Sequence, residues 1–331
     1  MSGTTNTLVE ISDYLYKKNP EGANEIINKL ESKYRQHIDE LFATPEYKQK
    51  GLELIKSHFD YIRSYTKDLF TLFEEKVVLA QGELISTAMM NYYLQECGVK
   101  SVLLPALEYM RTDKNAEPDP VYIKDKLQVQ LELHPDAEIY ITQGYICRNA
   151  YGEIDNLQRG GSDYTASLIG AAINASEIQI WTDIDGMHNN DPRIVDKTAP
   201  VRHLHFEEAA ELAYFGAKIL HPTCIQPAKY ANIPVRLLNT MDPTAPGTLI
   251  SNDTEKGKIK AVAAKDNITA IKIKSSRMLL AHGFLRKVFE IFESYQTSID
   301  MICTSEVGVS VSIDNCLLYT SPSPRDISGS R

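Results

Sequence analysis

Hydrophobic positions in the first part of the chain recur at helical spacing. Ile26 and Leu30 follow this spacing, and a second set that includes Phe59 follows it after Pro45. Apolar residues three and four positions apart lie on one face of a helix, so residues 21–73 are predicted to be helical, with a break at the proline. The charged residues between them would form the solvated face.

From about residue 77 the pattern changes to short apolar runs that alternate with helical stretches. Five runs are predicted to be strands, at residues 77–80, 101–104, 139–142, 178–181 and 234–238. A helix is expected to begin at Gly82, and residues 162–175 and 206–229 have the pattern and length of crossover helices. Short buried strands that alternate with helices are typical of an α/β protein with a largely parallel sheet.

A second domain is predicted after the turn at Pro246 and the polar stretch 251–258. Its expected elements follow in the order strand 268–273, helix 283–295, strand 299–304 and strand 307–313. This β-α-β-β order resembles an incomplete ferredoxin-like unit. The domains are therefore expected at 1–250 and 260–315, and residues 316–331, which break the periodicity, are expected to be a non-native or disordered tail.

Composition narrows the class of protein. The chain has 331 residues, a formal net charge of -9 and 43% hydrophobic residues, which is typical of a globular protein and argues against a nucleic-acid surface. The five cysteines are scattered without a CxxC spacing, so no metal site or disulfide framework is predicted. No apolar run approaches the roughly 20 residues of a membrane span, and the polar first residues do not form a signal peptide. A cytoplasmic location is expected.

The glycine loop Arg159-Gly160-Gly161-Ser162-Asp163 is the strongest candidate for chemistry. Two adjacent glycines let a ligand approach the backbone, and the following helix turns its N–H groups and positive dipole end toward the same place. The arginine adds a fork-shaped cation suited to a carboxylate or phosphate. The plainer interpretation is that Ser162 or Asp163 only caps the helix.

Three further loops carry polar residues at the ends of predicted strands or helices. They contain Trp181-Thr182-Asp183 with Asp191-Pro192-Arg193, Gly82-Glu83, and Phe215-Gly216-Ala217-Lys218. The plainer interpretations are a polar surface turn for the first loop, a helix-dipole partner for Glu83 and a solvated side chain for Lys218. His221 is interpreted as a structural turn residue. No P-loop, protein-kinase signature or GxGxxG string is present, so any phosphoryl transfer needs another scaffold.

Taken in order, six strings resemble the aspartokinase family over about residues 1–315. They are Met1-Ser2-Gly3-Thr4-Thr5-Asn6, Gln81-Gly82-Glu83-Leu84, Arg159-Gly160-Gly161-Ser162-Asp163-Tyr164-Thr165-Ala166, Trp181-Thr182-Asp183, Asp191-Pro192-Arg193 and Phe215-Gly216-Ala217-Lys218-Ile219-Leu220-His221-Pro222. The resemblance implies a three-layer α/β/α amino-acid-kinase sandwich followed by a partial ACT regulatory module. It also implies ATP-dependent phosphorylation of the L-aspartate side chain, the first step toward lysine, threonine and methionine.

The resemblance also implies roles for residues. Asp163 and Arg159 would be catalytic, and Thr5, Glu83 and Arg159 would hold the substrate. ATP with Mg²⁺ would be held by Thr182, Asp183, His188, Arg193 and Lys218. A regulatory amino acid, lysine or threonine, would bind near Met278, Gly283, Phe284, Leu285, Ser298, Asp300, Thr304, Ser305 and Glu306, which could also be ordinary core and turn residues. Pairing of ACT modules would make the protein a homo-oligomer.

Several departures from the family pattern qualify these expectations. The Lys-Phe-Gly-Gly strand that opens the family pattern has no counterpart here, and a second ACT module is not seen. His188 stands in place of a frequent tyrosine, and Gln158 in place of a frequent glycine. Weak or absent activity is therefore expected of this chain. Two alternatives stay open: another small-carboxylate kinase of the same fold, and a non-catalytic amino-acid-sensing subunit.

Overall fold

The computed structural model describes residues 3–67, 69–157, 161–192, 194–215, 220–253, 258–274, 282–305 and 307–314. The chain divides into two compact units, Met1–Ala263 and Ala264–Arg331. The sequence placed the change between residues 250 and 260. The tail expected at 316–331 lies outside the described residues.

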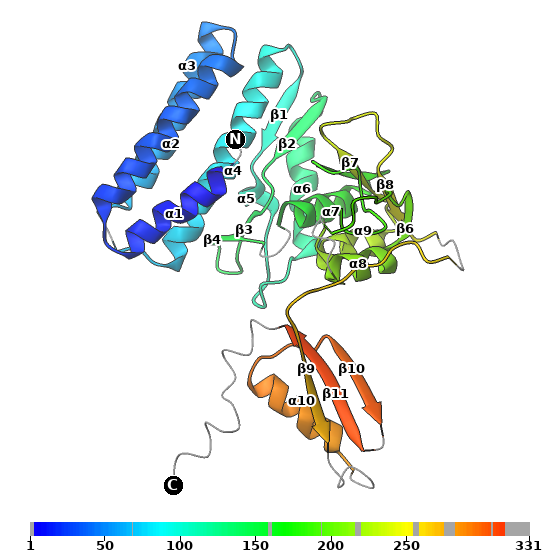
Figure 1. The fold of residues 1–331 in the computed structure, drawn as a ribbon. Helices are drawn as coiled ribbons and strands as arrows, with labels where there is room; N and C mark the ends of the chain where they lie inside the picture. The colour runs from blue at the N-terminus through cyan, green and yellow to red at the C-terminus, as the bar shows by residue number, and fades with distance from the viewer. Residues whose placement is uncertain are drawn as a thin grey trace. The chain divides into compact units, whose positions relative to one another are not determined.

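Four helices form the first part of the larger unit (Figure 1). They are α1 (Thr4–Tyr16), α2 (Pro20–Leu41), α3 (Pro45–Ser64) and α4 (Leu72–Glu96). Proline opens α2 and α3, where its missing N–H costs nothing, and the side chain of Asn19 caps α2 by accepting from the Gly22 N–H. The packed helices enclose one apolar cluster that includes Ile27, Tyr34 and Phe59. The prediction of helices up to about residue 73 is confirmed.

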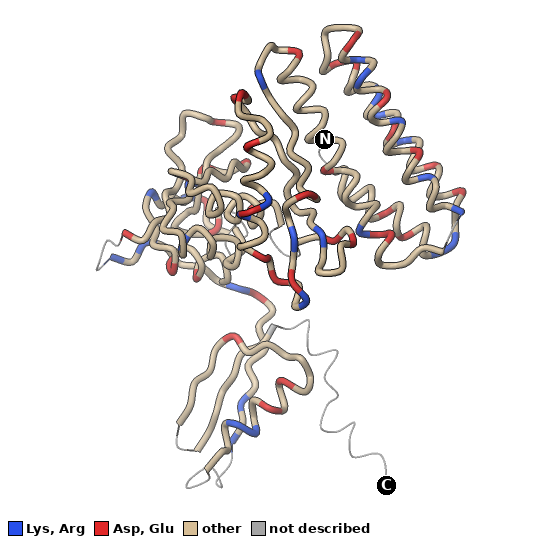
Figure 2. The backbone as a smooth tube through the Cα atoms, turned by 180° about the vertical axis from the view of Figure 1, so that it is seen from behind, with Lys and Arg blue, Asp and Glu red and all other residues tan. Residues whose placement is uncertain are grey.

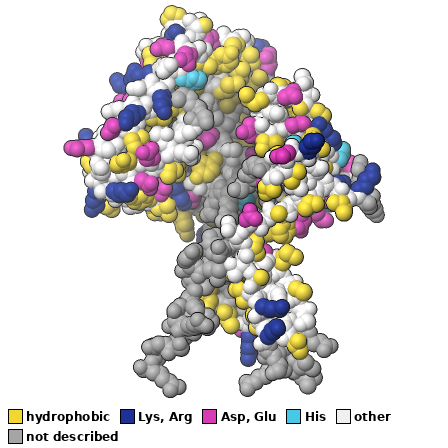
Figure 3. Space-filling model, in the orientation of Figure 1, with side chains coloured by type: hydrophobic (Ala, Val, Ile, Leu, Met, Phe, Trp, Pro, Cys, Tyr) yellow, Lys and Arg dark blue, Asp and Glu magenta, His cyan; other side chains and the backbone are white. Residues whose placement is uncertain are grey.

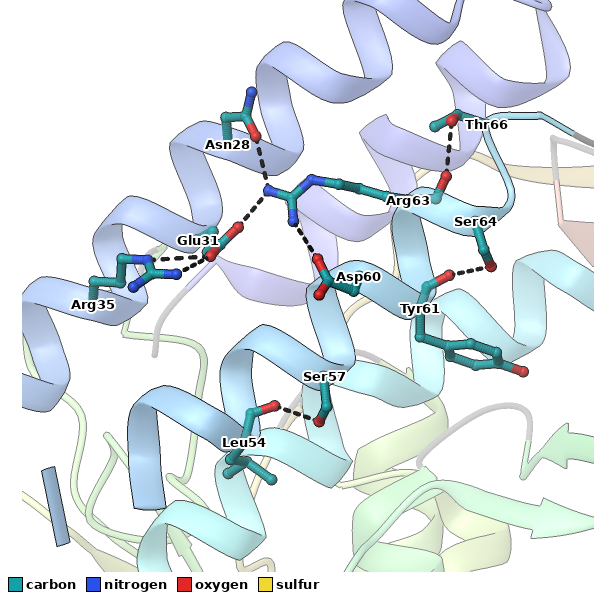
Figure 4. A network of polar contacts seen from close by, with 10 residues as sticks. All are labelled: Asn28, Glu31, Arg35, Leu54, Ser57, Asp60, Tyr61, Arg63, Ser64 and Thr66. Atoms are coloured by element: carbon teal, nitrogen blue, oxygen red, sulfur yellow. Dashed lines mark hydrogen bonds and ion pairs between the residues drawn. The ribbon is translucent and has the colours of Figure 1, made fainter. Parts of the chain in front are cut away.

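A polar network fastens α2 to α3 (Figure 4). The Arg63 guanidinium donates to Asn28 at 2.8 Å, to Asp60 at 3.2 Å and to Glu31, which also accepts from Arg35 at 2.6 Å. Only 8% of Glu31 is exposed. Burial acts to raise the pKa of this carboxyl, but the hydrogen bonds and charges of Arg63 and Arg35 outweigh it and the pKa is lowered.

The strand predicted at residues 77–80 is wrong, because this run lies inside α4. Thr71 and Glu74 form a capping box that starts the helix ahead of the run. The buried positions Val78, Gln81 and Ile85 then recur at helical spacing. A four-residue apolar run does not distinguish a strand from a helix, and here the cap and the packing decide. For the same reason Gly82 lies in the middle of a helix and not at its start.

Three sheets follow in the described part of the larger unit. In the first, β1 (Ser101–Leu104) and β2 (Ile139–Thr142) are parallel, and α4 packs against both. In the second, with the order β5-β7-β8-β6, β5 (Ile178–Thr182) is parallel to β7 (Val235–Asn239), and β6 (His203–His205) is parallel to β8 (Thr248–Ser251). β7 and β8 are antiparallel, as are the hairpin strands β3 (Ile146–Arg148) and β4 (Ile154–Asn156). The predicted α/β class with mostly parallel strands is confirmed.

The remaining helices of this unit position the candidate site. They are α5 (Ala106–Tyr109), α6 (Pro120–Glu132), α7 (Gly161–Ile173), α8 (Phe206–Phe215), the 3-10 turn η1 (Pro222–Ile225) and α9 (Gln226–Ala231). The single helix predicted at 206–229 is wrong, because His221 caps a separate 3-10 turn that begins at Pro222. α7 packs against α6, α9, η1 and β5, and Tyr164 of α7 contacts two of the apolar clusters.

The smaller unit contains β9 (Ile268–Lys274), α10 (Phe284–Ser294), β10 (Met301–Ser305) and β11 (Gly308–Asp314). Its antiparallel sheet has the order β10-β11-β9, which confirms the predicted β-α-β-β succession. Val288 of the helix is buried, and so are alternate residues of the central strand, among them Val309 and Val311.

The exposed surface of α2 and α3 carries charges of both signs. Lys and Arg alternate with Asp and Glu along α2 and α3 in Figure 2, and Figure 3 shows apolar and charged side chains interspersed over the same helices. Within the described part of the chain, no helix is both long enough and apolar enough to span a membrane.

Candidate functional site

The N-terminus of α7 lies directly on the turn that follows β2. A Cβ atom added to Gly144 would be 2.9 Å from the Ser162 Oγ and 3.1 Å from the Ser162 Cα, and one added to Gly161 would collide with the Tyr145 ring. Both positions therefore need glycine for this close approach. The chain reverses at Tyr145, whose φ of 70° is in the left-handed region.

Hydrogen bonds fix this contact. The Tyr145 N–H donates to the Thr165 Oγ1 at 3.1 Å, and the same hydroxyl donates to the Gly161 carbonyl at 2.8 Å. The Tyr145 carbonyl accepts from the Leu157 N–H at 2.7 Å, which closes the open end of the hairpin formed by β3 and β4. The first turn of α7 is thus fastened to the carboxyl end of β2, where ligands bind in open α/β sheets.

Asp163 lies in the first turn of α7, where the helix dipole favours a negative charge. Burial nevertheless raises the pKa of its carboxyl above the ordinary value. Within the described ranges no hydrogen bond or ion pair reaches this carboxylate. A half-buried acid without such a partner in a helix N-terminal turn is a candidate for a role in chemistry.

Glu83 is half buried on α4, and burial raises its pKa. The pKa of the Tyr145 phenol is raised mainly by burial and further by nearby carboxylates, of which Glu83 is one. Tyr145 is therefore near enough to Glu83 to be affected by its charge, and its ring lies against Gly161 at the start of α7. This arrangement gives one wall with an acid suited to an ammonium group and another with N–H donors suited to an anion.

Two threonines at the start of α1 differ in environment. Thr5, the predicted substrate residue, is exposed, and its role stays a prediction. Thr4 is buried, with its Oγ1 at 3.1 Å from the Tyr34 hydroxyl. Thr4 also lies against Gly82, where an added Cβ would be 3.3 Å from its methyl group.

The predicted nucleotide residues that the structure describes lie on the loop after β5. Thr182 ends the strand, and its hydroxyl accepts from the Ile184 N–H at 3.1 Å. The Thr182 carbonyl accepts from the Thr240 N–H at 2.7 Å, which joins the ends of β5 and β7. Asp183 is exposed, and the His188 Nδ1 is 2.8 Å from the Thr198 Oγ1. These neighbouring strand ends form an open, polar edge that suits a nucleotide.

Some predicted residues fall elsewhere. Arg159, Arg193, Lys218, Met278 and Glu306 lie outside the described residues. In the smaller unit, Gly283 caps α10 with a φ of 79°, and Phe284 and Leu285 follow it. Asp300 donates its N–H to the Ser312 carbonyl, Ser298 precedes it, and Thr304 and Ser305 are exposed on β10. The predicted effector residues are thus spread over the start of α10 and strand β10, and their binding role stays a prediction.

No group of three or more His, Cys, Asp or Glu side chains that could hold a metal ion is present among the described residues. The sequence interpretation missed Tyr145, Gln143 and Thr87, which connect the two walls. Gly144, two residues after the end of the predicted strand 139–142, was the signal in the sequence for this turn.

Comparison with known proteins agrees with this geometry. The sequence model of the Amino acid kinase family matches residues 5–239, and the chain belongs to this family. Its fold is therefore the amino-acid-kinase fold, as the sequence predicted.

Two curated relatives of the chain are aspartokinases. The chain is 35% identical to Aspartokinase 1, chloroplastic, of Arabidopsis thaliana over 97% of its own length and 58% of that protein. It is 39% identical to Lysine-sensitive aspartokinase 3 of Escherichia coli (strain K12) over 72% of its own length and 54% of that protein. It thus spans little more than half the length of these relatives.

Solved structures give the same answer. The crystal structure of E. coli aspartokinase III in complex with aspartate and ADP matches with a TM-score of 0.80 and 32% identity, over 95% of this chain and 70% of that one. The complex of the same enzyme with lysine and aspartate matches with a TM-score of 0.75. Within the amino acid kinases, the chain is a member of the aspartokinase family.

Proposed function

We propose that this chain carries the aspartate kinase reaction, in which the γ-phosphoryl group of ATP is transferred to the side-chain carboxylate of L-aspartate to give 4-phospho-L-aspartate. The observation that carries the proposal is that the helix with Glu83 and the helix with Asp163 both contact the short segment after β2: Gln143 and Thr87 connect it to α4, and Gly144 lies against Ser162 of α7. A substrate with one ammonium and two carboxylate groups matches an acid on one wall and N–H donors on the other.

The proposed roles follow from this placement. Glu83 binds the substrate ammonium group. The N–H groups of the first turn of α7 face negative charge on the substrate or the transferred group, and Asp163 orients the reacting carboxylate. Arg159 is proposed to hold a substrate carboxylate, on the strength of the matching family string. Because phosphoryl transfer depends mainly on position and charge neutralisation, no covalent intermediate with the protein is needed.

The nucleotide is proposed to bind at the edge formed by the ends of β5 and β7. Thr182 and Asp183 stand there, with His188 farther along the loop, and Arg193 and Lys218 are proposed to add positive charge. Bound Mg²⁺ would neutralise phosphate charge, and it is proposed to arrive with ATP, because the described residues contain no cluster of metal ligands.

The test is ATP-dependent formation of aspartyl hydroxamate when hydroxylamine is present. We expect product with L-aspartate and much less with L-glutamate or N-acetyl-L-glutamate. Thermal unfolding with L-aspartate and with ATP is measured in parallel, since a ligand that binds the folded state stabilises it. The absence of both hydroxamate and stabilisation by L-aspartate would refute the proposal. A preference for another acceptor would favour the small-carboxylate alternative.

A regulatory role is proposed for the smaller unit, whose β-α-β-β succession matches a partial ACT module. The relative crystallised with lysine supports an amino-acid effector. Titration of lysine and threonine against thermal stability tests this role, since a ligand that binds only the folded state must stabilise it. Stabilisation by an effector in the absence of any kinase activity would favour the sensing-subunit alternative.

Biosynthesis of lysine and threonine, assembly through ACT modules and a cytoplasmic location remain parts of the proposal. Three Arabidopsis relatives are named chloroplastic, so fractionation of source cells decides the location. Sedimentation of the purified chain tests the predicted homo-oligomer.

A further inference from the structure

Gln143 is a buried amide at the carboxyl end of β2, with 2% of its surface exposed. Its Oε1 accepts from the Ala106 N–H at 2.8 Å, at the start of α5. A backbone N–H can only donate, so this contact fixes which end of the amide is the oxygen. The Nε2 therefore points the other way, where it lies 3.0 Å from the Thr87 Oγ1 on α4.

A directed chain of hydrogen bonds leads from this amide to the turn that carries Glu83. Thr87 accepts from Gln143 and donates its own proton to the Glu83 carbonyl at 2.7 Å. The hydroxyl is thus used once as acceptor and once as donor, which is the pattern that fixes its orientation. The position of this turn of α4 is tied to the end of β2, a segment 56 residues away in the sequence.

The backbone that follows Gln143 makes the contact with α7. Gly144 lies against Ser162, and the Tyr145 N–H donates to Thr165. One residue therefore connects both walls of the candidate site: its side chain fastens α4, and its peptide neighbours fasten the helix that carries Asp163.

We propose that Gln143 is a positioning residue that sets the separation between Glu83 and the N-terminus of α7, and so the fit of the amino-dicarboxylate substrate. This inference rests on the proposed function. Loss of the amide leaves the buried Ala106 N–H without its acceptor and removes the hydrogen bond between the end of β2 and Thr87, so the two walls can shift relative to each other. Small misplacements of this kind reduce binding and turnover strongly.

Two near-isosteric variants test the proposal. Gln143→Met keeps the volume of the side chain and removes both hydrogen bonds, and Thr87→Val removes the hydroxyl between Gln143 and Glu83. Thr87→Ser keeps that hydroxyl and is the conservative rescue. Ser101→Ala is the matched control, because it deletes a buried hydrogen bond of 2.9 Å to Asn91 farther along the same helix.

Hydroxamate kinetics give the decisive measurement. We expect Gln143→Met and Thr87→Val each to raise KM for L-aspartate about tenfold or more and KM for ATP less than about twofold. The double variant should have about the same KM for L-aspartate as the single variants, because both substitutions break the same chain of hydrogen bonds. Thr87→Ser and Ser101→Ala should keep the wild-type KM for L-aspartate.

If Gln143 had only a structural role, its loss would lower the folded fraction, and therefore kcat, and leave KM for L-aspartate unchanged. This combination of results overturns the proposal. Wild-type protein with neither hydroxamate formation nor L-aspartate binding overturns the proposed function and, with it, the positioning role. Hydrogen exchange then separates the two failures. Faster exchange in Gln143→Met at residues 83–87 and 161–165 shows that Gln143 does connect α4 to α7, so that only the proposed reaction is wrong. Unchanged exchange shows that this connection is absent as well.

Discussion

Asp163→Asn is expected to stabilise the free protein while it removes activity. The change keeps the shape of the side chain and deletes the charge. Two effects oppose each other: the dipole at the start of α7 favours the carboxylate by about 0.3–1 kcal/mol, and burial penalises it. Burial raises the pKa of Asp163, and we expect it to be the larger of the two effects. Because the side chain is partly exposed, the net gain of the amide is expected to be no more than about 1 kcal/mol at pH 7.

The pH dependence gives the sign of the effect. A carboxyl whose pKa is higher in the folded than in the unfolded state contributes stability that is complete below the unfolded pKa of about 3.9. That contribution is lost as the pH rises through the folded pKa. The advantage of Asp163→Asn over the wild type should therefore be largest at neutral pH and should decrease as the pH falls toward about 4.

Urea unfolding at a series of pH values between about 8 and 4 measures this difference. Asp125→Asn, which removes an exposed carboxylate from α6, is the matched control and should change stability by less than about 0.5 kcal/mol. In the hydroxamate assay Asp163→Asn should lower kcat by about 100-fold or more. A variant that is less stable than the wild type at pH 7, with a deficit that grows with pH, would show that the carboxylate has a stabilising partner and would refute the reasoning.

Two further changes test the packing of the site and of the helices. Gly144→Ala places a methyl group 3.1 Å from the Ser162 Cα, a backbone atom that cannot rotate away. We expect urea unfolding to show a loss of stability of about 1–3 kcal/mol and kinetics to show a higher KM for L-aspartate. Unchanged stability and KM would show that α7 can move. Glu31→Gln removes the more buried of the two carboxylates that pair with Arg63, leaves only the exposed Asp60, and should cost about 1–3 kcal/mol at pH 7. Since the pKa of Glu31 is lowered, this loss should be present above the unfolded pKa of about 4.3 and diminish as the pH falls through the folded value, and a pH-independent loss would argue against the ion pairs.

The strength of the local signal decided which elements could be predicted from the sequence. Ser101–Leu104 and Ile139–Thr142 were predicted with the correct bounds because each apolar run is bounded by polar or turn residues. His203–His205 contains one buried residue, Leu204, so no alternation could be counted. Strands of three residues are defined by their partners in the sheet, and the sequence pattern does not contain those partners.

The candidate site divides in the same way. The glycine pair before Asp163 indicates a helix N-terminus near a ligand, and this local inference needs no tertiary information. The bond between Gln143 and Thr87 joins residues from different elements, and neither residue stands out in its own segment. Contacts of this kind arise when α4 packs on the β1–β2 sheet, so only the fold reveals them.

The string Gln81-Gly82-Glu83 shows what a short motif contributes. The Gln81 Oε1 lies 2.6 Å from the His58 Nδ1, and its Nε2 donates to the carbonyl one turn earlier in α4, so this side chain fastens α3 to α4. Gly82 allows α1 to approach, because an added Cβ would be 3.2 Å from the Leu8 Cδ1. Glu83 is the residue of the string that is proposed to bind the substrate. Gln81 and Gly82 therefore fix the position of the helix that carries Glu83. The substrate-binding role that was inferred from the whole string is proposed for the Glu83 side chain alone.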